Sequence, residues 1–484
     1  MKIEENRNTY KSILKGTSIF GGVQVFNIVI NLIRGKFVAI ILGPEGMGIS
    51  SLFATASNTI QRFGSLGLNQ AIVRETALHT ESGENQNPVM STVLMLIRST
   101  ALIGLIICVA FCVPLSRLTF GSESYWWQFM LLGVAVGFSI LSAGKLAILQ
   151  GLHEVKRISK ASIVGGLVGL CVGVPLYYLF GYKGIVPAMV ALALAMYLFY
   201  TINLRKASGR IMSIGFNWKE NFPVIKRLIL LGFVLMASDA IGSMVNYLLN
   251  LFLRHFGSID IVGLFQAANS VTNQYAGLVF AAMAMDYYPR LSRVMDDNIE
   301  MRKVVNRQTE IVSFLIAPAM CLLILSAPLV IRVLLSESFY TITPLMRWMG
   351  FGILLKALSF PMGYITFAKG DKKVFFLLEG LFGNLLFLVS GCVGFYLFGL
   401  IGLGYALVFE NLVAIVVYYI VDRKLYDYNF SEKSFINLLL AILAVGLCFG
   451  ASFFVSTALA YTFMGTVSMV TIVWSFVNIK ARLR

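Results

Sequence analysis

The sequence predicts an all-α polytopic membrane protein with about fourteen transmembrane helices. Of the 484 residues, 58% are hydrophobic and only 13% are charged, a composition that soluble domains do not have. Apolar stretches of about 20 residues recur from one end of the chain to the other, each long enough to cross a hydrocarbon core of roughly 30 Å. The pattern therefore predicts a bundle of membrane-spanning helices.

Each predicted span is an apolar stretch bounded by polar residues, and no connection between spans is much longer than about 20 residues. Connections this short leave no room for a domain outside the membrane, so the function is expected to lie within the bundle. The predicted spans are 13–42, 49–72, 89–113, 125–150, 159–181, 184–204, 225–253, 259–288, 303–335, 340–368, 373–398, 400–422, 434–456 and 459–479.

The first span opens at Ile13 and carries several polar side chains, so it lacks the uniform apolar core of a signal peptide and is expected to stay in the mature chain. The 39 Lys and Arg residues predict the orientation. With a cytoplasmic N-terminus, roughly 28 of them fall in cytoplasmic segments and about 3 (Arg117, Lys183 and Arg254) in external loops. Both termini are therefore predicted to be cytoplasmic.

The net charge of +16 follows from the same loops, which lie near anionic lipid headgroups, so membrane lipids are expected partners and nucleic acid is not. The six cysteines lie in apolar segments without disulfide or zinc spacing, and the three histidines are scattered. No Walker-type loop occurs. No metal, no cofactor and no internal use of ATP are expected.

An internal repeat predicts two lobes of six helices each. The segment from Gly144 to Val155 closes the fourth span, and a segment with the same glycine spacing, from Gly363 to Val374, closes the tenth. Six spans separate the copies, so both run in the same direction and are parallel repeats about an axis along the membrane normal. The predicted domains are a first lobe (1–208), a second lobe (209–425) and an extra helix pair with a basic tail (426–484).

Polar side chains form stripes along four of the spans. In the first two spans they recur every three or four residues, which places them on one side of a helix. These residues are Gln24, Asn27, Asn31 and Arg34 in the first span, and Ser51, Thr55, Asn58, Arg62, Ser65 and Asn69 in the second.

The seventh and eighth spans, the repeat partners of the first two, carry matching stripes. Their residues are Asp239, Ser243, Asn246 and Asn250, then Gln266, Asn269 and Asn273. If the four helices face one another across the repeat axis, they enclose one polar cavity, which is the predicted substrate site. Hydrogen bonds between helices are the alternative role for each Asn and Gln.

Charged residues within the spans are mostly basic. Eight cations facing lipid would cost about 24 kcal/mol, so most of them must line water or form pairs. The cations are Arg34, Lys36, Arg62, Arg98, Lys145, Arg332, Arg347 and Lys356, against the acids Asp239, Asp286, Glu310, Glu379 and Glu410. A net basic polar cavity favours an anionic, hydrophilic ligand such as a phosphate that carries sugar hydroxyls.

The individual cations differ in depth. Arg34, Arg62 and Arg98 fall roughly 13 to 20 Å from the nearest predicted helix end, so each is expected either to face the cavity or to form a structural ion pair. Lys36 points away from Arg34, which leaves a cavity role and an interhelical role open. Lys145, Arg332 and Arg347 lie nearer span ends, where they are expected to extend to the interface. The candidate site consists of the striped residues, except Ser65 and Asn69, together with Lys36, Arg98 and Lys356.

Over about residues 10 to 425 the chain resembles the multidrug/oligosaccharidyl-lipid/polysaccharide (MOP) flippase superfamily, and within it the Wzx-type flippases. The carriers are short segments in the family's order: 35–36 with 42–48, 288–293, 334–339, Lys356, and 377–379. The resemblance implies a V-shaped pair of six-helix lobes in the bacterial inner membrane. It also points to Lys36, Lys356 and Glu379 as family-type charged positions, whereas Arg62 rests on the stripe alone.

The resemblance further implies a function: outward transport of an undecaprenyl-pyrophosphate-linked oligosaccharide by alternating access, without enzymatic chemistry. Other polysaccharide-assembly proteins are candidate partners. The final helix pair departs from shorter family members and is expected either to pack outside the second lobe or to form a groove for a lipid tail. The sugars carried, the energy source and the oligomeric state do not follow from the sequence.

Two other function classes stay open. A cation or drug antiporter would place acids at the cavity centre, where Asp239 is the clear candidate. A membrane glycosyltransferase or polymerase would need an acidic metal site. The candidate is the pair Asp296 and Asp297, in a basic loop where a solvated turn is the simpler reading.

Overall fold

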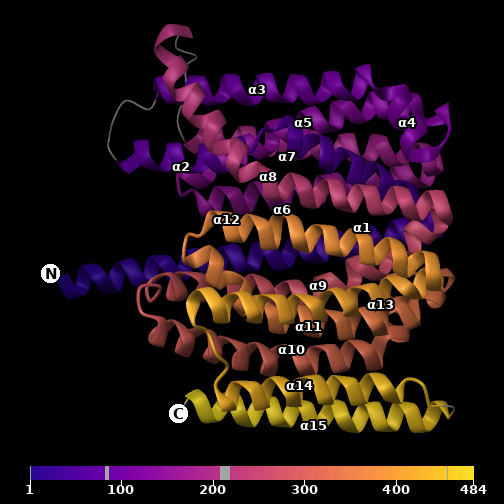
Figure 1. The fold of residues 1–484 in the computed structure, drawn as a ribbon. Coiled ribbons are helices and arrows are strands. Elements are labelled where there is room, and N and C mark those ends of the chain that lie inside the picture. The colour runs from indigo at the N-terminus through magenta and orange to yellow at the C-terminus, as the bar shows by residue number, and fades with distance from the viewer. Residues whose placement is uncertain (1, 82–86, 208–217, 455, 484) are drawn as a thin grey trace. The chain divides into compact units, whose positions relative to one another are not determined.

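A computed structural model confirms the all-α membrane class (Figure 1). It describes residues 2–81, 87–207, 218–454 and 456–483, and all regular secondary structure in these ranges is helical. The side chains of Gln24 and Asp286 lie outside the described part of the structure.

The described residues of the first half of the chain form eight α-helices and two short 3-10 turns. They are α1 (Lys2–Gly64), α2 (Leu68–Glu81), α3 (Asn87–Ala110), α4 (Cys112–Phe120), η1 (Glu123–Tyr125), α5 (Trp126–Gly151), α6 (Val155–Phe180), η2 (Gly181–Gly184), α7 (Ile185–Ala207) and α8 (Trp218–Phe256).

The second half contains seven α-helices, a 3-10 turn and a π-helical segment. They are α9 (Ile259–Ser292), α10 (Asn298–Leu334), η3 (Glu337–Ile342), α11 (Thr343–Ala368), α12 (Lys372–Phe375), the π-helical η4 (Phe376–Gly383), α13 (Asn384–Tyr426), α14 (Glu432–Ala451) and α15 (Thr457–Leu483).

The described helices account for the predicted crossings. Nine segments of the described chain are long and apolar enough to span a membrane. Three of them, Val25–Gly64, Val155–Ala207 and Lys372–Tyr426, are 40, 53 and 55 residues long, about twice the length of one crossing. Each of these holds two predicted spans, and α8 and α9, of 39 and 34 residues, hold the seventh and eighth.

Glycines make the sharp turns inside the double-length segments. α1 breaks at Gly43 (φ 66°, ψ −165°) and α13 at Gly399 (φ 63°, ψ −147°), a conformation that is essentially restricted to glycine. Across the second turn the backbones of Gly394 and Gly402 touch, so that a Cβ on either residue would collide with the other's carbonyl oxygen. Two spans are thereby joined with hardly any loop.

One predicted span has the wrong end. The sequence stripe continues to Asn69, but α1 ends at Gly64 and α2 begins at Leu68. Leu66 and Gly67 between them have left-handed φ values of 49° and 65°, which no α-helix can contain. Asn69 therefore belongs to a separate short helix, and the continuous stripe ends near Arg62.

The chain forms two compact units, residues 1–255 and 256–484. The core of the first unit includes Ile72, Ile148 and Ala161, and that of the second includes Tyr287, Met301 and Ile365, all fully buried. Helix α8, which the internal repeat assigns to the second lobe, belongs to the first compact unit. The limits 1–208, 209–425 and 426–484 rest on the internal repeat and stay a prediction.

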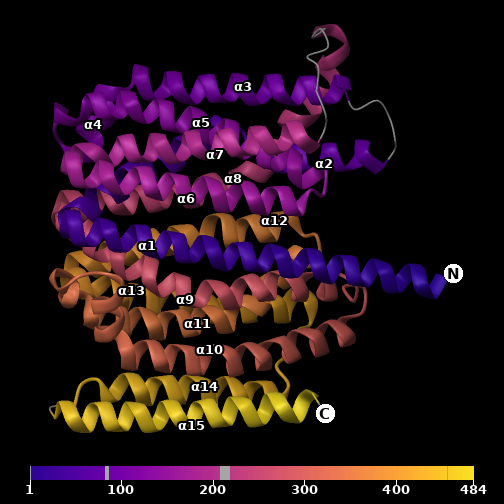
Figure 2. The ribbon, with the colours of Figure 1, turned by 180° about the vertical axis from the view of Figure 1, so that it is seen from behind.

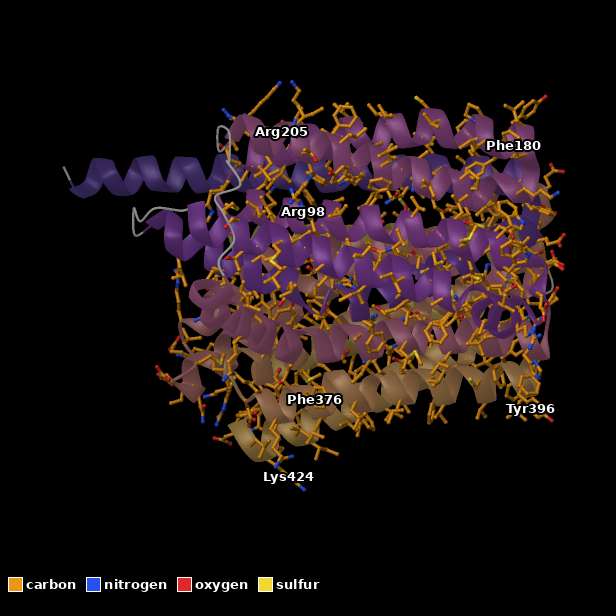
Figure 3. All side chains as sticks on the ribbon, turned by 90° about the horizontal axis from the view of Figure 1, so that it is seen from above. Arg98, Phe180, Arg205, Phe376, Tyr396 and Lys424 are labelled. Carbon is orange, nitrogen blue, oxygen red and sulfur yellow. The ribbon has the colours of Figure 1, made fainter. Side chains whose placement is uncertain are left out.

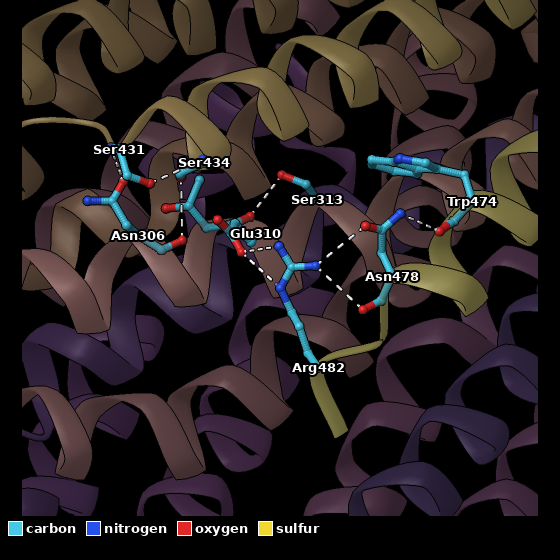
Figure 4. A network of polar contacts seen from close by, with 9 residues as sticks. Asn306, Glu310, Ser313, Ser431, Ser434, Trp474, Asn478 and Arg482 are labelled. Carbon is cyan, nitrogen blue, oxygen red and sulfur yellow. Dashed lines mark hydrogen bonds and ion pairs between the residues drawn. The ribbon is translucent and has the colours of Figure 1, made fainter. Parts of the chain in front are cut away.

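The two final helices, α14 and α15, pack against α10 of the second unit, and α14 also contacts α11 (Figures 1 and 2). Arg482 near the end of α15 forms an ion pair with Glu310 of α10 and lies 4.7 Å from the ring centroid of Phe314 (Figure 4). At the start of α14, the side chain of Asn306 accepts a hydrogen bond of 2.8 Å from the backbone N–H of Ser431. Asn306 and Glu310 lie one turn apart on α10, so these contacts fix the start of α14 and the end of α15 to the same part of that helix.

Candidate functional site

Two predicted polar stripes meet within the first unit, where the second half of α1 runs antiparallel to α8. Three hydrogen bonds join the two helices. From one bond to the next, the residue number increases on α1 and decreases on α8. Asn250 Nδ2 donates to Thr55 Oγ1 (3.3 Å), Thr59 Oγ1 donates to the carbonyl oxygen of Ser243 (3.1 Å), and Arg62 Nη1 donates to Asp239 Oδ2 (3.2 Å). We call these six residues the α1–α8 seam.

The seam changes from buried to exposed along its length. Asn250 and Thr59 are buried, whereas the side chains of Arg62 and Asp239 are 54% and 52% exposed. Asn58 and Asn246, which lie between the three contacts in sequence, are also exposed. The Arg62 end therefore presents charged and amide groups together on an accessible surface.

The ion pair at that end is weak, and in the described part of the chain it occupies one side-chain nitrogen of Arg62. An exposed pair of this kind contributes roughly 0.2–1 kcal/mol, because water screens both charges. The Arg62 guanidinium has five N–H donors, and one nitrogen contacts Asp239. Arg62 also lies in the last turn of α1, where the helix dipole favours a cation. An anionic ligand can therefore bind Arg62 beside Asp239 or in its place.

The other end of α8 is held by contacts that the stripes did not indicate. Tyr247 and Thr119 of α4 share a hydrogen bond of 2.6 Å between their hydroxyls. Arg254, predicted to lie in an external loop, donates to the carbonyl oxygen of Phe120 at the end of α4. These partners were missed because α4 is a short, apolar helix without periodic polar residues.

The first-span stripe divides between two roles. Asn27 and Ser162 of α6 exchange hydrogen bonds of 3.1 and 3.2 Å, so Asn27 takes the interhelical role. Arg34 is half-buried and acts electrostatically on Tyr177 of α6, while Asn31 is exposed and Lys36 half-buried. Ser51 is buried, and its hydroxyl has no partner among the described residues.

The eighth-span stripe lies on α9, in the second unit. Asn273 is exposed and donates to the side chain of Asn269 (2.6 Å), one turn away on the same helix, and Gln266 is half-buried. A polar cavity shared by the stripes of both units stays a prediction.

A second charged group lies within the spans of the second unit. Tyr418 of α13 donates a hydrogen bond of 2.6 Å to Glu379, which sits in the π-helical η4. Lys356 of α11 is exposed and acts electrostatically on both Glu379 and Glu410. The carboxylate of Glu379 lies against Gly363, where any Cβ would crowd it. Sequence reasoning found Lys356 and Glu379 but not Tyr418, since aromatic residues are common throughout these spans.

Lys145 contradicts its predicted role. The sequence places it at the interface, but it is only 8% exposed. Its ammonium donates to Thr201 Oγ1 of α7 (2.5 Å) and lies 3.7 Å from the ring centroid of Tyr197. These two partners keep the charge inside the bundle. Arg98, by contrast, is exposed, and Arg332 is exposed near the end of α10.

Among the described residues, no group of three or more His, Cys, Asp or Glu side chains is placed to hold a metal ion. Of the acidic pair at 296–297, Asp297 has a structural role. It caps α10 by accepting hydrogen bonds from the backbone N–H groups of Ile299 (2.8 Å) and Glu300 (3.3 Å).

The amino-acid sequence matches a known protein family and several named relatives. The model of the family described as polysaccharide biosynthesis protein matches residues 37–344. The lipid III flippase of Escherichia coli strain K12 is 22% identical over 360 residues, which are 72% of this chain and 83% of that protein. A putative O-antigen transporter of Shigella flexneri is 24% identical over 316 residues, 63% of this chain and 72% of the transporter.

Solved structures share the fold. The lipid II flippase MurJ in an inward closed conformation matches with a TM-score of 0.71 at 14% identity, over 96% of this chain and 99% of that one. An inward-facing multidrug transporter of the MATE family, in the MOP superfamily, matches with a TM-score of 0.70 at 16% identity, over 83% and 94% of the two chains. The chain therefore has the MOP flippase fold.

Proposed function

Because the chain belongs to the polysaccharide biosynthesis protein family, we propose that it is a flippase for an undecaprenyl-pyrophosphate-linked oligosaccharide, an O-antigen or related surface repeat unit. Transport runs from the cytoplasmic to the periplasmic leaflet of the bacterial inner membrane, with both termini of the chain cytoplasmic. The relatives named as flippase and O-antigen transporter support this proposal at low identity.

The observation that carries the proposal is the exposed end of the α1–α8 seam. A membrane-spanning segment there presents an arginine with free donors, held by a weak ion pair and flanked by the amides of Asn58 and Asn246. Guanidinium groups bind phosphate oxygens through paired hydrogen bonds, and amides bind sugar hydroxyls. A ligand that carries both groups matches this surface.

In the proposed mechanism the pyrophosphate displaces Asp239 from Arg62, and Arg34 supplies further positive charge from the first half of α1. The amide side chains of the stripes hold the sugars while the lipid tail remains in the bilayer. Alternating access requires the helices to move as packed groups about short connections. The turns at Gly43 and Gly399 are of that kind, since each joins two spans without a loop.

A cation antiporter fits the described residues less well. The acid it would use, Asp239, already has a cationic partner in Arg62. An acid that pairs with arginine has less need of a proton or a sodium ion for charge balance. A glycosyltransferase is disfavoured by the capping role of Asp297, so we propose transport and not catalysis.

The test is reconstitution of the purified chain in liposomes that carry undecaprenyl-pyrophosphate oligosaccharide in one leaflet. The measurement is the rate at which the headgroup becomes accessible in the other leaflet, for the wild type and for Arg34→Ala and Arg62→Ala. Arg117→Ala is the matched control, because Arg117 is an exposed arginine paired with Glu123 at the opposite side of the spans.

Protein-dependent exposure of the headgroup that Arg34→Ala and Arg62→Ala each reduce by at least about tenfold, with Arg117→Ala unchanged, supports the flippase. A tenfold effect corresponds to one charge-assisted hydrogen bond. Absence of exposure, together with efflux of a cationic dye driven by a pH gradient, would replace the flippase with an antiporter.

A further inference from the structure

Three cations of the first unit gather at a place that the seam does not include. Arg98 lies on α3, Lys145 on α5 and Arg205 in the last turn of α7, and these three helices pack side by side in the order α3, α5, α7. Figure 3 shows Arg98 and Arg205 toward one end of the bundle, with Phe180 at the other. By the predicted orientation this is the cytoplasmic end.

Lys145 forms the rigid back of the cluster. Its residue is more than nine-tenths buried, its Nζ donates to Thr201 Oγ1 (2.5 Å), and the Tyr197 ring beneath it packs on Phe138 at a centroid distance of 5.4 Å. An ammonium group has three N–H donors. The Thr201 hydroxyl takes one and the Tyr197 ring face attracts the charge from another side, which leaves donor capacity in a fixed position.

Arg98 and Arg205 lie beside Lys145 on the two neighbouring helices, and both are exposed. Arg205 follows Thr201, the hydrogen-bond partner of Lys145, by one turn of α7. Ile97, the neighbour of Arg98, packs against Gly144, the neighbour of Lys145. In the described part of the chain, no hydrogen bond or ion pair joins any of the three cations to a carboxylate. Like charges on adjacent helices repel one another, and an anion bound among them would relieve the repulsion.

We infer that Arg98, Lys145 and Arg205 form a binding site for a lipid-borne diphosphate. Three cations match the two or more negative charges of a diphosphate better than the single charge of a phospholipid phosphodiester. Two guanidinium groups supply paired donors for separate phosphates, and Lys145 supplies a point charge between them. The inference rests on the proposed function, in which this site would receive the headgroup before it reaches the α1–α8 seam.

The test measures binding of undecaprenyl diphosphate and, separately, of phosphatidylglycerol to the full chain in detergent by native mass spectrometry. An Arg62→Gln background keeps the seam from contributing. The variants are Arg98→Gln and Arg205→Gln, both at exposed positions. Lys206→Gln is the matched control, since it makes the same charge change at the same end of α7 but points about 100° away around the helix.

We expect each arginine variant to raise the dissociation constant of undecaprenyl diphosphate about tenfold, as loss of one charge-assisted contact predicts. Lys206→Gln should change it less than about twofold, and phosphatidylglycerol binding should respond less than about twofold to all three variants. An equal loss with Lys206→Gln, an equal loss of phosphatidylglycerol, or no loss with either arginine variant overturns the site.

The binding test also separates this inference from the proposed function. If the wild type fails to flip the oligosaccharide while diphosphate binding still depends on Arg98 and Arg205, the proposed function fails and the site stands. If the wild type flips the oligosaccharide and diphosphate binding is indifferent to both arginines, only the site fails.

Discussion

Two ion pairs within the membrane-spanning helices have the same chemistry and different surroundings. Arg62 and Asp239 are both about half exposed and share a single hydrogen bond of 3.2 Å. Arg482 and Glu310 are 35% and 9% exposed, and two nitrogens of Arg482 contact the same carboxylate oxygen (Figure 4). The first pair can exchange a partner for a ligand, whereas the second fixes α15 to α10.

Burial explains the difference. Water competes for the charges of an exposed pair, so replacing one partner by an anion of similar charge costs little. A buried carboxylate such as Glu310 has no such alternative, and separating it from Arg482 leaves an uncompensated charge. Phe314 and Asn478 enclose Arg482 further. An ion pair within the spans therefore indicates a ligand-binding role only when both of its side chains are exposed.

Glu310→Gln should have the largest effect on stability, a loss of about 2 kcal/mol. This is below the loss of a fully buried pair, because Arg482 is one-third exposed. The measurement is unfolding of the detergent-solubilised chain. Glu300→Gln on the same helix is the control, since Glu300 pairs with Lys303 at the surface and its loss should cost less than about 0.5 kcal/mol. Equal losses for both variants would contradict a structural lock at Glu310.

Exchange of the two charges, Glu310→Arg with Arg482→Glu, should recover about half of that loss, roughly 1 kcal/mol, because the pair is restored while its packing against Phe314 is not. The comparison is with the two single variants in the same unfolding assay. If the double variant is less stable than both single variants, the surroundings of position 310 require a negative charge there, and restoring an ion pair of reversed polarity does not stabilise the fold.

Arg62→Gln should change the free energy of unfolding by less than about 0.5 kcal/mol, since an exposed ion pair stabilises the fold only weakly. The same protein should lose flipping in the liposome assay. Unfolding and transport measured on one preparation separate the two roles. A stability loss as large as that of Glu310→Gln would make the seam pair structural and remove it from the substrate site.

Asp239→Asn should have the smallest effect. It leaves stability nearly unchanged and frees Arg62, so the substrate concentration for half-maximal flipping should fall about two- to threefold, equivalent to roughly 0.5 kcal/mol. The measurement is the flipping rate over a range of substrate densities in the liposome. Complete loss of transport would instead assign Asp239 a direct role, such as binding of a coupling ion.

The membrane class, the approximate number of crossings and the polar faces of the helices follow from the amino-acid sequence alone. These properties depend on local quantities: the length of an apolar stretch against the bilayer thickness, and a period of 3.6 residues. The stripes that contain Thr55 and Asn250 follow from this period alone, without knowledge of the contact between these two residues. The one clear boundary error, at 49–72, arose because the left-handed Leu66 and Gly67 interrupt a segment that stays apolar.

The tertiary fold brings together polar groups from distant parts of the chain, and periodicity does not predict these pairs. Asn27 pairs with Ser162, Arg62 with Asp239 and Glu310 with Arg482, over separations of 135 to 177 residues. It also buried Lys145, which lies near a predicted span end but packs under α7. Periodicity fixes the face on which a side chain lies, but the neighbour of that face depends on how helices pack, and in hydrocarbon that packing is governed by the whole set of close contacts.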